Sequence, residues 1–97
     1  MYYNKNGLGD TVQSDIKKCA EKVGRLKPND EISFTSLDFV SGQLYDSVLK
    51  GLESAHYVWV LGCAVHRWFR NKDTHVSLKC DFRPDVIIIK REKESLK

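Results

Sequence analysis

The stretch that decides the fold runs from residue 63 to residue 82 and reads CAVHRWFRNKDTHVSLKCDF. If its two halves are strands, successive side chains alternate between two faces. One face then collects apolar or thiol side chains with a single charge: Cys63, Val65, Arg67, Phe69, Val76, Leu78, Cys80 and Phe82. The other face is polar apart from one alanine and one tryptophan: Ala64, His66, Trp68, Arg70, His75, Ser77, Lys79 and Asp81. This alternation predicts a β-hairpin with one buried face.

A tight turn and a third strand complete this part of the sheet. A two-residue loop at Lys72-Asp73 predicts three facing pairs: Arg70–His75, Trp68–Ser77 and His66–Lys79. The turn at residues 83–85 contains Pro84, and the β-branched run 86–89 then predicts another strand. That strand keeps the same face apolar if two pairs form: Phe82–Ile87 and Cys80–Ile89.

Residues 57–61 predict a strand before the hairpin, and Gly62 predicts a bulge or bend after it. Further upstream, Asp10 and Gln13 form a capping-box pattern that predicts a helix starting at residue 10 and ending at Gly24. The apolar stripe of this helix has helical spacing: Val12, Ile16, Cys19, Ala20 and Val23.

The middle of the chain alternates between short elements. Residues 31–35 predict a strand, and residues 36–40 predict one helical turn. Ser41 is a suitable cap for a longer helix from residue 43 to about residue 55. Its expected buried stripe follows helical spacing: Tyr45, Val48, Leu49, Leu52 and Ala55.

Length and composition limit the chain to one small domain. It has 97 residues and a net charge of +3, which permits a polyanionic partner without requiring one. We expect a flexible lead-in over 1–9, a single domain over 10–91 and a charged tail over 92–97. The sequence contains no apolar run long enough for a membrane helix, and its three cysteines are an odd number. We therefore expect reduced thiols, a cytoplasmic protein and no membrane partner.

This order of elements resembles the winged helix-turn-helix superfamily. The resemblance rests on residues 27–37 and 45–58, on the step from Leu49 to Leu52, and on the strand that follows at Tyr57. It implies an α+β, winged-helix-like fold with the order helix–strand–helix–helix, followed by an antiparallel hairpin or meander. It also implies a DNA-binding transcription regulator, and small proteins of this kind often act as dimers.

A duplex-reading helix is the first candidate site. In helix-turn-helix proteins the second helix of the motif enters the major groove. Gln43 is suited to reading adenine and Lys50 to reading guanine, while Ser47 could contact a base or a phosphate. Ser41 and the backbone amides at the start of this helix could bind a phosphate. The alternative is that these are ordinary solvent-facing residues, with Asp46 among them repelling phosphate.

The polar face of the predicted hairpin is the second candidate site. Its cationic and imidazole side chains are suited to phosphate contacts: His66, Arg70, His75 and Lys79, with Lys72 at the turn. Trp68 on the same face could stack on a base. Equally, Trp68 could anchor a protein interface. Tyr2 and Tyr3, with the C-terminal strand, could form the contact of a homodimer.

These observations favour an intracellular nucleic-acid-binding regulator with duplex DNA as its expected partner. The alternative is a protein-interaction or inhibitor module of the phage or plasmid type. A ribonuclease similar to RelE-type toxins is a third, but His66 and His75 would lie too far apart to share a phosphate. A zinc site formed by Cys63, His66, His75 and Cys80 would need ligands from opposite faces. We expect no enzyme activity, no catalytic residues, no metal and no cofactor.

Overall fold

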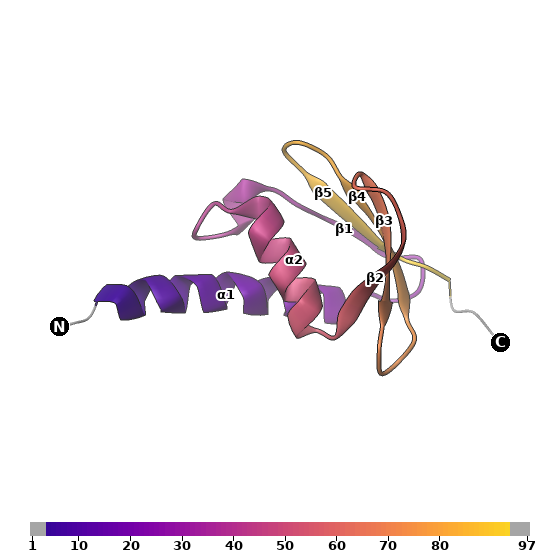
Figure 1. The fold of residues 1–97 in the computed structure, drawn as a ribbon, viewed down its shortest axis with the longest axis horizontal. Coiled ribbons are helices and arrows are strands. Elements are labelled where there is room, and N and C mark those ends of the chain that lie inside the picture. The colour runs from indigo at the N-terminus through magenta and orange to yellow at the C-terminus, as the bar shows by residue number, and fades with distance from the viewer. Residues whose placement is uncertain (1–3, 94–97) are drawn as a thin grey trace.

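The computed structural model describes residues 4–93 (Figure 1). These residues form two α-helices, one 3₁₀ turn and five strands. Their bounds are α1 (Asn4–Gly24), β1 (Glu31–Phe34), η1 (Ser36–Asp38), α2 (Leu44–Ser54), β2 (Tyr57–Gly62), β3 (His66–Asn71), β4 (Ser77–Phe82) and β5 (Ile87–Arg91). The expected α+β class is confirmed, but of the expected helix–strand–helix–helix order the second helix is only the short turn η1. No helix within residues 4–93 is long and apolar enough to cross a membrane.

The five strands form one antiparallel sheet in the order β1-β5-β4-β3-β2. Both helices lie on the same side of this sheet (Figure 1). The core lies between the helices and that side of the sheet, and its largest fully buried apolar side chains are Phe34, Leu52, Leu78, Ile87 and Ile89. We call this side the covered face and the opposite side the open face. The first strand of the chain pairs with the last one, so β1 and β2 are the two edges.

Within β3 and β4 the side chains lie on the predicted faces, but the hairpin register differs by two residues. The observed pairs include Arg70–Ser77, Trp68–Lys79 and His66–Asp81. The loop is longer than the expected two residues because the Asn71 side chain organises the turn after β3. A shift of two preserves the face of every side chain that remains in a strand, since strand side chains repeat every two residues. The expectation that His75 pairs with Arg70 is wrong, because His75 lies in the loop before β4 with a φ of 65°. Phe82–Ile87 and Cys80–Ile89 pair as predicted.

The first helix begins at Asn4, so the expected start at Asp10 and the expected flexible lead-in over 1–9 are wrong for residues 4–9. Helix elongation adds one hydrogen bond per residue to an existing nucleus, which outweighs the poor propensity of Gly7 and Gly9. Residues 1–3, with Tyr2 and Tyr3, lie outside the described residues. At the other end Glu92 donates its N–H to Ser77, so the expected tail begins one residue later.

The buried stripe of α2 is rotated from the predicted one. Its buried residues are Leu44, Ser47, Val48, Gly51 and Leu52. The expectation that Ser47 faces solvent is wrong, since its exposure is 4%. Tyr45, expected in the core, is exposed and donates its hydroxyl proton to the carbonyl of Arg83. The rotation follows from Gly51, which has no side chain and lets α2 contact α1 closely.

A buried carboxylate of α1 holds the segment that precedes α2. Asp15 accepts hydrogen bonds from the N–H groups of Val40 at 2.8 Å and Ser41 at 2.9 Å. Between β1 and α2, where a winged helix has its second helix, the chain forms only the three-residue turn η1. The winged-helix resemblance therefore stays a prediction.

Candidate functional site

The open face carries no helix in the part of the chain that the structure describes. Along β4 the buried residues Leu78, Cys80 and Phe82 point to the core, so the residues between them point to the opposite side. The register extends this face across all five strands. Its members are Glu31, Ser33, Val58, Leu61, His66, Trp68, Arg70, Ser77, Lys79, Asp81, Ile88 and Lys90. A partner that approaches this face meets side chains whose positions the paired strands fix.

A row of long side chains crosses the middle of the open face. The register aligns Lys90 with Lys79, Lys79 with Trp68, and Trp68 with Leu61 on four neighbouring strands. The Lys79 Nζ atom lies 5.5 Å from the centroid of the Trp68 ring. Trp68 is half-buried, so its ring lies against the sheet with part of its surface in solvent. The row therefore combines an aromatic surface with two cations.

The charges of the open face are arranged unevenly. Arg70 lies two residues along β3 from Trp68 and is exposed, which adds a third cation beside the row. Of the acids, Asp81 is engaged by the Nδ1 atom of His66 at 2.7 Å. Glu31 lies on the edge strand β1, directly opposite Lys90. The centre of the face, at Lys79 and Arg70, is thus cationic, and these two carboxylates face His66 or lie at the edge beside Lys90.

The residues predicted to read a duplex from α2 do not form one exposed cationic surface. Gln43 immediately precedes α2 and is exposed, and its N–H donates to the Ser41 hydroxyl oxygen at 3.1 Å. Ser47 is buried, and Lys50 forms an ion pair with Asp46 at 3.4 Å. Lys50 is thus the one cation among Ser41, Gln43, Ser47 and Lys50. It is paired with a carboxylate one helical turn away.

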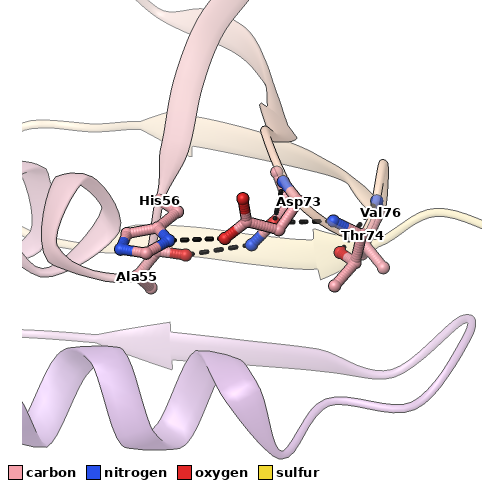
Figure 2. Close-up of polar contacts among 6 residues, drawn as sticks. Ala55, His56, Asp73, Thr74 and Val76 are labelled. Carbon is pink, nitrogen blue, oxygen red and sulfur yellow. Dashed lines mark hydrogen bonds and ion pairs between the residues drawn. The ribbon is translucent and has the colours of Figure 1, made fainter.

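The turns at one end of the sheet are linked by polar contacts (Figure 2). His56 Nδ1 lies 2.6 Å from an Asp73 oxygen, which connects the α2–β2 turn to the β3–β4 loop. The Asn71 side chain donates to the Ala55 carbonyl and accepts from the N–H groups of Asp73 and Thr74. Lys72, predicted as a phosphate contact, is exposed in this loop, at the end of β3.

A cavity of about 410 Å³ lies beside these turns and is lined by Tyr57, Asn71, Thr74 and Arg91 among others. Burial raises the pKa of Tyr57, against the effects of a hydrogen bond with Asn71 and the charge of Arg91. Asn71 is fully engaged by the turns, and Arg91 donates to the Leu26 carbonyl at 2.8 Å. These groups join elements of the fold, so we assign the cavity a structural role.

One contact that sequence reasoning missed lies on the covered face near the β2 edge. The guanidinium of Arg67 lies 4.4 Å from the ring centroids of both Trp59 and Phe82. Its Nε atom donates to the Ala64 carbonyl at 2.9 Å. The signal was the single charge on an otherwise apolar strand face. Stacking between two rings accommodates that charge, so Trp59 has a defined position although it is 49% exposed.

The three cysteines are free thiols. Cys19 and Cys80 are buried in the core, whereas Cys63 is exposed beside the β2–β3 turn. The expectation that Cys63 and Val65 join the buried face is wrong, because residues 63–65 form the exposed connection between β2 and β3. Comparisons with models of known protein families, with curated proteins and with solved structures found no match to this chain.

Proposed function

We propose that this protein binds single-stranded nucleic acid through the open face of its sheet. The observation that carries the proposal is the row Lys90–Lys79–Trp68, with Arg70 beside it. Single strands bind where aromatic rings stack on bases and cations follow the phosphates. This keeps the predicted nucleic-acid-binding class but replaces the predicted duplex-reading helix with the sheet as the contact surface.

A single strand fits this surface better than a duplex does. Bases of a duplex are stacked on one another, whereas those of a single strand can lie on an exposed ring. A duplex reader needs side chains on a helix that enters a groove. The buried Ser47 and the paired Lys50 leave α2 poorly equipped for that task.

The test is fluorescence anisotropy of labelled 20-nucleotide mixed-sequence RNA and DNA single strands, with the matching duplex, at 50 and 200 mM salt. We expect single strands to bind more tightly than the duplex. Three phosphate contacts predict about twentyfold weaker single-strand binding at the higher salt. Trp68→Ala should weaken binding at least about fivefold through lost stacking.

The charge contribution has a matched control. Replacing Lys79 and Lys90 together by Glu should weaken binding by at least tenfold. Replacing Lys17 and Lys22 of α1 by Glu changes net charge equally but alters exposed positions on the helix layer, so binding should change much less. Tighter binding of the duplex than of the single strands would contradict the proposal. So would an affinity that Trp68→Ala leaves unchanged. No binding at 50 mM salt would favour a protein-interaction module anchored on Trp68.

A further inference from the structure

The β2 strand is an exposed and uncharged edge of the sheet. Among residues 4–93 it pairs with β3 alone, and residues 58–62 are all exposed. Its sequence, YVWVLG, contains no charged residue. Edge strands normally carry charges, prolines or other features that prevent pairing with another chain. The opposite edge, β1, is shorter and begins with Glu31. Only β2 therefore combines length with an uncharged edge.

The register shows which backbone groups of β2 point outward. Tyr57 is opposite Asn71, and the residues next to them are joined by a hydrogen bond from the N–H of Lys72 to the carbonyl of His56. In an antiparallel ladder, a hydrogen bond between such neighbours means that the facing pair itself is a non-hydrogen-bonded pair. Because pair types alternate, Trp59 opposite Phe69 is also non-hydrogen-bonded. The N–H and C=O groups of Tyr57 and Trp59 thus point away from β3.

We propose that β2 pairs antiparallel with β2 of a second copy of this chain, about a two-fold axis at Val58. The outward groups of Tyr57 then meet those of the partner's Trp59, and the reverse pair forms by symmetry. Each of these two pairs exchanges two hydrogen bonds, as antiparallel hydrogen-bonded pairs do. The groups lie symmetrically about Val58, so the edge is complementary to itself. A self-complementary patch is what a two-fold dimer requires.

The side chains along this edge suit the same arrangement. Val58 lies on the open face and is 38% exposed, so two valines would meet at the axis. Trp59 would lie across from Tyr57 on the covered face, as a cross-strand aromatic pair. Its indole N–H already donates to the Leu61 carbonyl at 2.9 Å, and Arg67 contacts its ring. The exposed ring therefore offers apolar surface without an unmet donor.

The ladder irregularities confine the interface to residues 57–59. His56 has a positive φ of 71°, and the β2–β3 register shifts between Trp59 and Leu61. A bulge at this point interrupts regular pairing on the outer side as well. A three-residue pairing is short, so we expect a reversible dimer with a dissociation constant on the order of 100 µM. The two sheets would become continuous, with both open faces on the same side.

Sedimentation velocity of the whole chain from 5 to 500 µM tests this inference without nucleic acid. We expect the weight-average mass to rise towards that of a dimer. Val58→Lys and Val58→Glu should each weaken association at least tenfold, because like charges meet at the axis. An equimolar mixture of the two variants should recover association, since opposite charges then meet. Val58→Thr is the matched uncharged control and should remain close to the wild type.

Two results would overturn the inference. One is a wild-type chain that stays monomeric at 500 µM, and the other is association that both charged variants retain. If the charged variants fail to fold by circular dichroism, Val58→Cys in a Cys63→Ser background provides the second measurement. Facing residues of a non-hydrogen-bonded pair are close enough for a disulfide. Oxidation should cross-link two copies through residue 58, and failure to do so would contradict the axis.

Discussion

Gly51 of α2 lies directly against Cys19 of α1. A Cβ atom built on Gly51 would lie 2.5 Å from the Cβ atom and 2.6 Å from the Sγ atom of Cys19. The carbonyl oxygen of Ile16 would lie 3.2 Å away. The missing side chain at position 51 therefore sets how closely the two helices approach, and with it which stripe of α2 is buried.

Gly51→Ala should lower the free energy of unfolding by about 1–2 kcal/mol. The cost of overpacking exceeds the gain of up to about 1 kcal/mol that alanine brings to a helix interior. Urea unfolding followed by circular dichroism measures the change. Gly24→Ala is the control, because nothing lies within 4 Å of a Cβ at that position. Equal stability of the two variants would contradict the close helix contact.

Asp15→Asn should also destabilise the protein. The carboxylate, which is 2% exposed, gives one oxygen to the N–H of Val40 and the other to that of Ser41. An amide has one acceptor oxygen, so one part-buried N–H loses its partner at a cost of about 1 kcal/mol. Chemical unfolding at pH 7 measures the cost. Replacing the exposed neighbour Ser14 by Ala should leave stability nearly unchanged, and an equal loss there would argue against the tether.

The same carboxylate predicts a pH dependence. Burial alone would raise the pKa of Asp15, but hydrogen bonds from the Ser41 hydroxyl and the Ser41 and Val40 amides, with the charge of Lys18, lower it overall. The ionised form then stabilises the fold above the unfolded-state pKa, which is about 4. That contribution disappears as pH falls through the lowered native pKa. Unfolding curves between pH 2.5 and 7 should be flatter for Asp15→Asn, and parallel curves would contradict this assignment.

Asn71→Ala should loosen the β3–β4 loop. It removes the donor to Ala55 and the acceptor for the N–H groups of Asp73 and Thr74. We expect a loss of about 2 kcal/mol, with faster amide hydrogen exchange at residues 73 and 74. Asp73→Asn is the matched control, since it weakens only the exposed pair with His56. Unchanged exchange in Asn71→Ala would refute the role of this side chain.

The three cysteines should differ in reactivity. Burial raises the pKa of Cys19 to about 12 and also raises that of Cys80. Hydrogen bonds from the backbone of His66 and Val65 lower the pKa of the exposed Cys63. Iodoacetamide at pH 7.5 should therefore add one label per native chain and three in denaturant. Mass spectrometry counts the labels, and Cys63→Ser should remain unlabelled while folded. Two native labels at similar rates would contradict this burial.

Local patterns predicted the elements and most of their faces. The hairpin alternation identified Leu78, Cys80 and Phe82 as buried, and the β4–β5 pairs were correct. The error of two residues in the hairpin register did no harm to the face assignment, because strand periodicity is two. In α2 the predicted buried stripe differs from the observed one, so Ser47 was expected at the surface but lies in the core. A difference of one helix position rotates such a stripe by about 100°.

The candidate site was predicted in part. His66, Trp68, Arg70 and Lys79 were expected on one polar face and lie there. Lys90 was missing from that prediction, because its place beside Lys79 depends on the strand pairing. The pairing of Trp68 with Lys79 likewise followed only once the Asn71-organised loop defined the register.

By itself the sequence determined what a few neighbouring residues decide: the periods that make strands and helices, the turn residues between them, and the apolar side of each strand. The tertiary structure decided what depends on distant segments. It paired β1 with β5, which left β2 as the second edge, and it stacked both helices on one face, which left the other open. The physical reason is that edge and coverage belong to the arrangement of the whole chain, whereas alternation and capping are satisfied within a few residues.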